Sequence, residues 1–222
     1  LKWNKNNFTL AKDEKNLPSF PSEFMIKLFS SPHYSVNFSP MRSGMKVLDV
    51  GCGSANNLRF FHSKSLHCYG VEVNQEMVGL ANNNSARMGI VADIRRGTNT
   101  KVPFSDGYFD IVTSLNTIHY ENDDEGVLRS LEEFRRVLSP EGKLFLVTAG
   151  PSHEIRREVE RVGGMQYIVK NYGFRSGDIF SFFDDKDHLH EIAKKIFKNV
   201  EVGVITESYS TTTLQFLYLL AK

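Results

Sequence analysis

The chain has 222 residues, of which 41% are hydrophobic, a proportion that suits one globular domain with a single large core. Its 27 basic residues nearly balance its 26 acidic residues, so no strong positive field exists to bind a nucleic-acid backbone or an anionic membrane surface. No apolar run approaches the roughly 18 residues of a membrane-spanning helix. The charge balance therefore disfavours a nucleic-acid partner, and we expect no membrane association.

The first half of the chain alternates predicted strands and helices. Residues 46–50 (KVLDV) predict a short buried strand, followed by a Gly-rich turn and a helix. Residues 67–73 predict a second strand, and Asn74 can cap the helix that follows it. Residues 89–93 predict a third strand, and residues 108–116 predict a fourth.

The second half continues this alternation and ends in a hairpin. Residues 127–138 carry apolar side chains at helical spacing, residues 143–149 predict a fifth strand, and residues 184–197 predict another helix. The last two strands, roughly 199–207 and 212–220, are joined by only a few residues and must pair antiparallel. Apolar strands joined by helices indicate an α/β fold, with a mostly parallel sheet covered on both faces.

The two cysteines are expected to remain reduced. Cys52 follows the first strand and Cys68 lies near the start of its parallel neighbour, so at about 3.3 Å per residue they are beyond disulfide reach. Free thiols are typical of a reducing cytosol. The segment LKWNKNNFTL has no apolar core like that of a secretion signal. We expect a cytoplasmic location.

The turn after the first strand, in VLDVGCGSANNL, carries two glycines. Gly51 and Gly53 would lie beyond the C-terminal end of the strand, where open parallel sheets bind ligands. A dinucleotide site would have a third glycine where this chain has Asn56, and the Asp49 carboxylate would repel a pyrophosphate. The turn therefore favours a ligand that carries an ammonium group.

Two further carboxylates end the next two predicted strands. Glu72, 21 residues beyond Gly51, can accept hydrogen bonds from both ribose hydroxyls. Asp93 can accept a hydrogen bond from an exocyclic adenine amine, while the Ile94 amide contacts a ring nitrogen. Each acid alone is also typical of a strand end that faces water. Together with Asp49, the two acids describe an adenosine with a zwitterionic tail and no phosphate, which is S-adenosylmethionine (SAM).

The sequence resembles the class I, Rossmann-like SAM-dependent methyltransferases. VLDVGCGSANNL is similar to their first motif, VEVN to the acidic end of their second strand, and VAD to their adenine site. FDIVTSLNTIHY and FRRVLSPEGKLFLV resemble the segments around their fourth and fifth strands. The resemblance covers about residues 44–150 strongly and 184–220 in outline. It implies a seven-stranded doubly wound sheet in the order 3-2-1-4-5-7-6, with the seventh strand antiparallel and helices on both faces.

The resemblance also implies SAM as the cofactor, with S-adenosylhomocysteine (SAH) as its product. The expected cofactor-binding residues are Asp49, Gly51, Cys52, Gly53, Glu72, Val73, Asp93, Ile94, Leu115 and Asn116. On the acceptor side, His119 is the candidate general base, because its unperturbed pKa lies near neutrality. Local packing is the alternative role for this histidine. Tyr34, Tyr120 and Tyr172 are the candidates for acceptor binding.

Two segments lie outside the alternation and are expected to decide acceptor specificity. Residues 1–44 are interpreted as a helical lid, and residues 150–183 as an acceptor-side insertion in a core domain of residues 45–222. The arginines of HEIRREVER can bind a phosphate or carboxylate. A solvated helix face, with glutamates that offset these charges, is the alternative for that segment.

The expected function is direct transfer of a methyl group to an O or N atom of a small polar metabolite. SLNT stands where amino-methylases carry (D/N)PPY, which argues against that subclass. No Pro-Cys nucleophile follows the fourth strand, which argues against methylation through a cysteine adduct. No Cys/His cluster has the spacing of metal ligands. Three alternatives remain open. They are a methyltransferase that acts on a protein or RNA, a NAD-dependent oxidoreductase, and a module that binds SAM without turnover.

Overall fold

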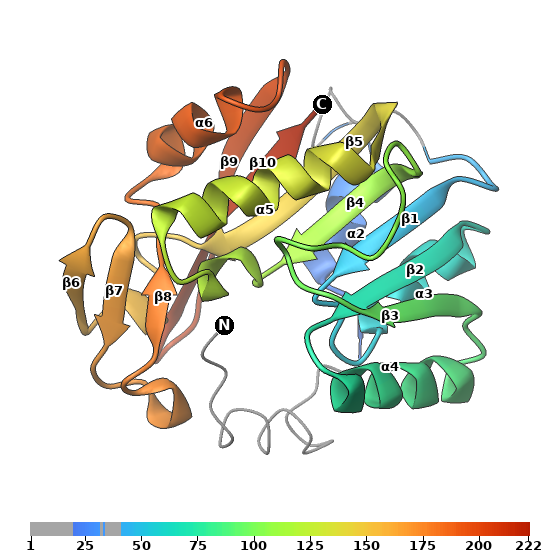
Figure 1. Cartoon of the computed structure of the whole chain (residues 1–222). Helices are drawn as coiled ribbons and strands as arrows, with labels where there is room; N and C mark the ends of the chain where they lie inside the picture. Colours follow the sequence, from blue (N-terminus) through green and yellow to red (C-terminus); the bar gives the residue numbers. More distant parts are fainter. Residues whose placement is uncertain (1–19, 32, 34–40) are drawn as a thin grey trace.

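The computed structural model describes residues 20–31, 33 and 41–222, and its centre is a seven-stranded sheet (Figure 1). The strands are β1 (Lys46–Val50), β2 (His67–Glu72), β3 (Ala92–Arg96), β4 (Phe109–Leu115), β5 (Leu138–Ala149), β9 (Val200–Ser208) and β10 (Thr213–Ala221). Their order is β3-β2-β1-β4-β5-β10-β9, and β10 pairs antiparallel with both β5 and β9. The predicted strand order and terminal hairpin are confirmed.

Helices cover both faces of this sheet. They are α2 (Glu23–Ser30), α3 (Asn56–Ser63), α4 (Gln75–Arg87), α5 (Asp124–Val137) and α6 (Lys186–Lys194). Successive strand residues point to opposite faces: Val47 packs in one apolar cluster with Leu58 of α3, whereas Leu48 packs in another with Leu131 of α5 and Leu189 of α6. Each such buried side chain contributes roughly 1.5–3 kcal/mol, so the two clusters hold the helices onto the sheet.

The acidic run ENDDE begins α5, as its position before an apolar helix predicts. The side chain of Asp123 caps the helix by accepting a hydrogen bond from the Gly126 amide at 2.6 Å. Asp124 and Glu125 follow in the first turn, where negative charge is favourable.

The third strand lies later in the chain than predicted. Gly89 adopts a φ of 68°, and the Ile90 amide still bonds to the Ser85 carbonyl of α4, so residues 89–90 complete the end of that helix. β3 therefore runs from Ala92 to Arg96. The prediction that Asp93 ends this strand is wrong.

Residues 150–183 form a small sheet of their own. Its strands are β6 (Val159–Gly163), β7 (Gln166–Val169) and β8 (Ile179–Ser181), in that order and antiparallel. The segments η3 (Glu154–Arg156) and η4 (Gly173–Arg175) are single 3₁₀ turns, so HEIRREVER is not the helix that was the alternative for it. Val169, Phe180 and Phe182 pack against Ala149, and this contact fastens the insertion to the carboxyl end of β5.

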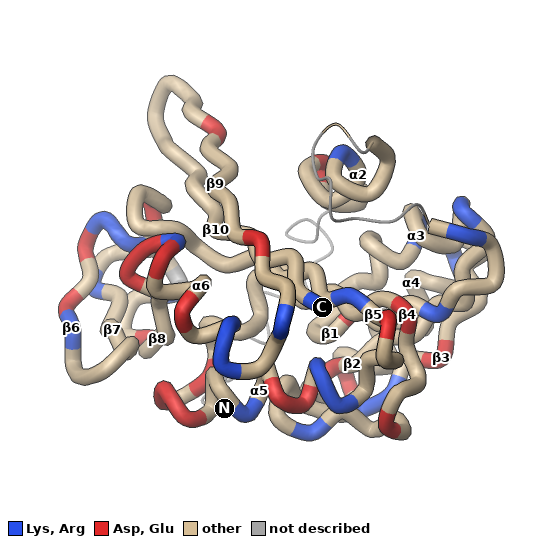
Figure 2. The backbone as a smooth tube through the Cα atoms, turned by 90° about the horizontal axis from the view of Figure 1, so that it is seen from above, with Lys and Arg blue, Asp and Glu red and all other residues tan. Residues whose placement is uncertain are grey.

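The proposed lid lies mostly outside the described residues. Within it, α2 packs Met25 and Phe29 into the cluster that also contains Phe61 and Phe145. Viewed from above, α2 and the β9–β10 hairpin stand out on the same side of the sheet, and basic and acidic residues are interspersed along the described backbone (Figure 2). Over the described ranges, no helix has the length and apolar character needed to cross a bilayer.

Candidate cofactor and acceptor site

The turn between β1 and α3 brings the two glycines to the carboxyl edge of the sheet. Gly51 and Gly53 have φ values of 72° and 55°, a region that favours glycine. A Cβ on Gly51 would lie 2.2 Å from Thr117 Cγ2 in the loop after β4. Gly51 therefore allows two loops to meet where a ligand of the sheet would bind.

Asn116, which directly follows β4, also has a left-handed backbone, with a φ of 57°. Its amide donates to the Val147 carbonyl of β5 at 2.8 Å. Backbone strain of this kind in a non-glycine residue is typical of functional sites. Leu115, the last residue of β4, packs at the margin of the apolar cluster that contains Val47 and Leu58. Both residues lie at the sheet edge where the sequence predicted them.

Glu72 ends β2 and turns its carboxylate back toward the glycine turn. The Gly53 amide donates to Glu72 Oε1 at 2.7 Å, and the Val73 amide donates to Oε2 at 3.1 Å. The side chain is 8% exposed, and burial raises its pKa while the two amides oppose that rise. Each carboxylate oxygen keeps further acceptor capacity, which fits it to receive two ribose hydroxyls.

Asp49 is the most deeply buried acid of the site, with 1% exposure. Thr113 Oγ1 donates to its Oδ1 at 2.7 Å, and Asn57 Nδ2 donates to its Oδ2 at 3.4 Å. Burial raises the pKa of Asp49 to about 7 despite these hydrogen bonds. Within the described part of the chain, no cation offsets this carboxylate. A ligand that brings an ammonium group to this position would lower that pKa and be bound by the resulting charge.

Cys52 lies between these two acids and remains a thiol. It is 5% exposed, and burial, together with the charges of Glu72 and Asp49, raises its pKa far above the ordinary value. Its amide donates to the Val71 carbonyl at 3.2 Å. The residue therefore contributes backbone geometry to the turn rather than a reactive thiolate.

Asp93 and Ile94 do not lie with the other predicted cofactor residues. Asp93 is paired in register with Tyr69 near the start of β2, whereas Glu72 is paired with Arg96. At about 3.3 Å per residue, Asp93 is roughly 10 Å from the edge that carries Glu72. Its carboxylate forms an ion pair with Arg95 at 2.6 Å, and Ile94 is buried in the apolar cluster that contains Val47 and Leu58. Neither residue therefore lies at the edge of the sheet that carries Asp49 and Glu72.

The loop after β3 takes their place at the carboxyl edge. The Gly97 amide donates to the Glu72 carbonyl at 2.9 Å, and a Cβ on Gly97 would lie 2.6 Å from Pro103 Cδ. A glycine directly before the polar run TNT is the sequence signal that could have placed the strand end correctly.

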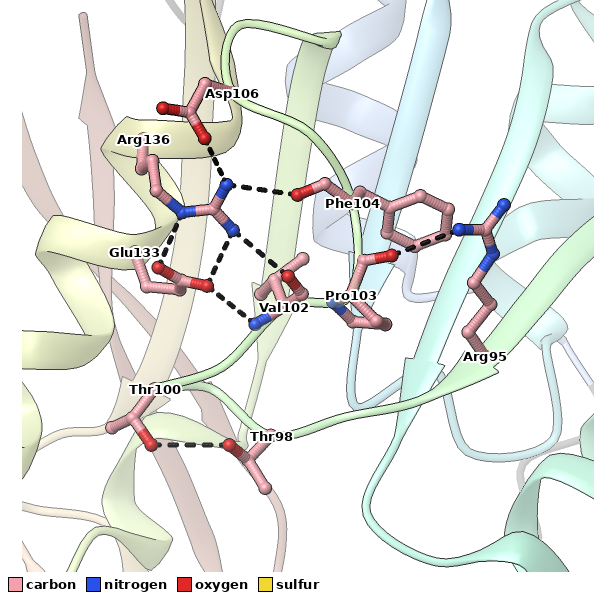
Figure 3. Close-up of polar contacts among 9 residues, drawn as sticks. All are labelled: Arg95, Thr98, Thr100, Val102, Pro103, Phe104, Asp106, Glu133 and Arg136. Atoms are coloured by element: carbon pink, nitrogen blue, oxygen red, sulfur yellow. Dashed lines mark hydrogen bonds and ion pairs between the residues drawn. The ribbon is translucent and has the colours of Figure 1, made fainter.

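Arg136 of α5 holds the far part of this loop in place (Figure 3). Its guanidinium donates to the carbonyls of Val102 and Phe104, both at 3.0 Å, and pairs with Glu133 and Asp106. Glu133 in turn accepts a hydrogen bond from the Val102 amide at 2.7 Å. The planar fork of an arginine satisfies all these acceptors at once, and it anchors the loop whose other end reaches Glu72.

His119 lies in the short turn η2 (Ile118–Tyr120), among aromatic rings. It is 7% exposed, and its ring centroid is 4.5 Å from that of Tyr120 and 5.0 Å from that of Phe180. Burial lowers its pKa to about 3, and the positive charges of Arg175 and His153 add to the effect. The imidazole is therefore neutral at pH 7 and accepts a hydrogen bond readily, but it holds a transferred proton poorly. Its buried Nδ1 has no hydrogen-bond partner among the described residues.

The insertion sheet completes the wall around His119. Tyr120 Oη accepts a hydrogen bond from the Arg175 guanidinium, whose carbon lies 5.0 Å from the Tyr120 ring centroid. Tyr172 Oη donates to Glu154 Oε1 at 2.6 Å, and its ring borders the cluster around Phe180. Tyr120 and Tyr172 thus lie on one wall with His119, whereas Tyr34 lies outside the described residues. Over the described ranges, no cluster of acidic, His or Cys side chains could hold a metal ion.

Residues 48–146 match the family model described as a methyltransferase domain. The chain is 32% identical over 107 residues to the uncharacterized methyltransferase YcgJ of Bacillus subtilis, covering 48% of this chain and 41% of that protein. It is 30% identical over 173 residues to the ubiquinone/menaquinone biosynthesis C-methyltransferase UbiE of Shewanella sp. strain ANA-3, covering 73% and 63%.

The fold is shared with a SAM-dependent methyltransferase from Methanosarcina mazei. The TM-score is 0.68 with 17% identity, and the match covers 91% of this chain and 98% of that one. The chain spans less than two thirds of the length of these two curated relatives.

Proposed function

Since residues 48–146 belong to the methyltransferase-domain family of the class I, SAM-dependent type, we propose that the protein binds SAM and transfers its methyl group to a small-molecule acceptor. One observation carries this proposal. Two buried carboxylates, Asp49 and Glu72, meet at a glycine turn on the carboxyl edge of the sheet with no cation of the described chain between them. A nucleoside with hydroxyls at one end and an ammonium at the other complements this arrangement.

The residues of this chain bind and orient both reactants. Glu72 would receive the ribose hydroxyls and Asp49 would attract the ammonium. Gly53, where a Cβ would have open space around it, leaves room for the ligand to approach, and Gly51 lets the loop after β4 pack against the turn. Bound SAM supplies an electrophilic methyl group on its sulfonium. The protein then has to align a nucleophile with that methyl group and exclude water.

For the acceptor, we propose an O or N atom of a small polar metabolite. His119 is neutral at pH 7, so it can accept a hydrogen bond from the acceptor hydroxyl or amine and direct a lone pair toward the methyl group. Its lowered pKa argues against a role as a strong general base, so the proton that the acceptor loses passes on to solvent while SAM leaves as neutral SAH. Tyr120 and Tyr172 form the neighbouring wall.

A carbon acceptor on an aromatic ring is the second candidate. The relatives named as quinone-biosynthesis C-methyltransferases suggest it, and the rings of Tyr120 and Phe180, 5.1 Å apart, offer an aromatic surface beside His119. An activated ring carbon places little demand on a base before methyl transfer, which agrees with the low pKa of His119.

Calorimetric titration with SAM, SAH and NAD tests the cofactor proposal. We expect roughly micromolar binding of SAM and SAH and none of NAD. Glu72→Ala should weaken SAM binding by about 1–3 kcal/mol, the scale for loss of a charge-assisted hydrogen bond. If NAD binds and SAM does not, the proposal is wrong.

Methyl-labelled SAM incubated with pooled metabolites, and separately with protein and RNA fractions, tests the acceptor class. The chemical shift of the labelled methyl group in the purified product distinguishes O, N and C attachment. Label only in protein or RNA would contradict a small-molecule acceptor.

A further inference from the structure

A buried polar pair lies between the loop after β3, on the cofactor side of the proposed site, and the turn η2, on its acceptor side. Asn99, in the loop after β3, and Glu121, directly after η2, are 7% and 5% exposed. Asn99 Nδ2 donates one hydrogen bond to Glu121 Oε1 at 2.9 Å and another to the Thr117 carbonyl at 3.2 Å. Since an amide nitrogen has two protons, its whole donor capacity is directed at the segment between β4 and α5.

The partners of Asn99 also contact the glycine turn and the insertion. Thr117 lies against Gly51 on one side. On the other side, the Glu121 carbonyl accepts a hydrogen bond at 2.8 Å from Oγ of Ser181, which ends β8 and is 1% exposed. A continuous chain of contacts therefore joins the loop after β3, the turn that carries His119, and the insertion sheet.

A buried carboxylate in this place is costly for the fold. Burial raises the pKa of Glu121, and the hydrogen bond from Asn99 is the largest effect that opposes the rise. A buried polar network of this kind adds little net stability, but it specifies one arrangement of the segments that it joins. These segments come from three separate parts of the chain, and all three border the proposed site.

We propose that Asn99 and Glu121 are a positioning pair that couples cofactor binding to the arrangement of the acceptor wall, which is formed by His119, Tyr120 and Tyr172. The inference rests on the proposed function. A ligand that orders the loop after β3 fixes Asn99, and through Glu121 it fixes η2 and the end of β8. By linkage, anything that holds the acceptor wall in the same arrangement also strengthens cofactor binding.

Amide hydrogen exchange with and without SAH, together with calorimetric titration with SAH, tests the coupling. In the wild type, SAH is expected to slow exchange in residues 97–101, 116–121 and 179–181. In Asn99→Ala and Glu121→Ala, we expect roughly tenfold weaker SAH binding and loss of the slowing at 179–181. The double variant should bind no more weakly than either single variant, because both remove the same bond.

Two further variants separate positioning from general damage. Glu121→Gln keeps an oxygen that accepts the Asn99 bond, so it should resemble the wild type. Glu125→Ala removes an exposed carboxylate from the first turn of α5, 78% exposed, and should leave SAH affinity and exchange unchanged. If Glu121→Ala does not fold, Asn99→Ala carries the test.

Equal SAH affinity and equal slowing at 179–181 in the wild type and Asn99→Ala overturn the coupling. A Glu121→Gln variant as impaired as Glu121→Ala also overturns it. If the wild type binds no SAH, the proposed function fails, and the pair is judged in the free protein alone. There, Asn99→Ala must speed exchange in both 116–121 and 179–181, and unchanged exchange overturns the inference.

Discussion

Replacing Asp49 by Asn should make the ligand-free protein more stable and the cofactor site worse. The carboxylate is 1% exposed, and burial raises its pKa from 3.8 to about 7. The folded state therefore binds the Asp49 proton more tightly than the unfolded state does. The contribution of Asp49 to the free energy of unfolding is therefore fully present below about pH 4 and is lost as the pH rises to about 7.

The size of this effect follows from the two pKa values. At about 1.4 kcal/mol for each pH unit, the difference between 3.8 and about 7 corresponds to roughly 4 kcal/mol at alkaline pH. Between about pH 5 and about pH 8, the wild type should lose about 2.5 kcal/mol relative to Asp49→Asn. The variant does not titrate at this position, and the pH dependence that comes from the other ionisable groups is shared by both proteins and cancels in the comparison.

Urea denaturation of the ligand-free wild type and Asp49→Asn at several pH values measures this difference. Asp187→Asn, which alters an exposed carboxylate in the first turn of α6, is the control and should follow the wild type. Parallel stability curves for the wild type and Asp49→Asn would refute the assignment of Asp49 as a buried acid with a raised pKa. The expected gain rests on burial alone and does not require that SAM be the ligand.

The second part of the prediction concerns the effect of SAM binding on the proton of Asp49. An ammonium beside Asp49 lowers its pKa, so binding near pH 7 should release up to about half a proton. Calorimetry in buffers of different ionisation enthalpy measures this release. Asp49→Asn should bind SAM about 1–3 kcal/mol more weakly and release no proton from this position. Wild-type proton uptake on binding would contradict a cationic group at Asp49.

Three further predictions concern the turn, the loop and the acceptor wall. Gly51→Ala should abolish SAM binding or folding, because its Cβ would lie 2.2 Å from Thr117 Cγ2, and wild-type SAM binding by this variant would contradict the packing. The control is Gly107→Ala, because Gly107 also has a positive φ, of 65°, but has open space where the Cβ would lie. Arg136→Lys should lose roughly 2 kcal/mol of unfolding free energy, because a lysine cannot satisfy both the Val102 and Phe104 carbonyls; an unchanged urea midpoint would contradict this. His119→Ala should lower the rate of methyl transfer while SAM affinity persists, and a wild-type rate would remove His119 from the acceptor site.

Much of the fold could be predicted from the sequence, because it depends on local signals. The alternation of apolar strands with helices requires a covered parallel sheet, and the short link between the last two strands leaves only an antiparallel hairpin. Asp49, Gly51 and Glu72 were placed correctly at the sheet edge, because each lies within or beside a strand whose end is marked by a turn or a cap. Asp93 was misplaced, because GIVAD has an apolar pattern that does not distinguish the end of a helix from the beginning of a strand.

Other properties of the site were decided only by the tertiary structure. Residues 150–183 form a three-stranded sheet whose Phe180 and Phe182 pack against Ala149 at the end of β5, and no local sequence pattern encodes this contact. The low pKa of His119 and the raised pKa of Asp49 arise from burial and from charges distant in the chain. The sequence by itself determined which groups stand at the strand ends. Only the folded chain determined how far water is excluded from them, and exclusion of water sets their charge and their chemistry.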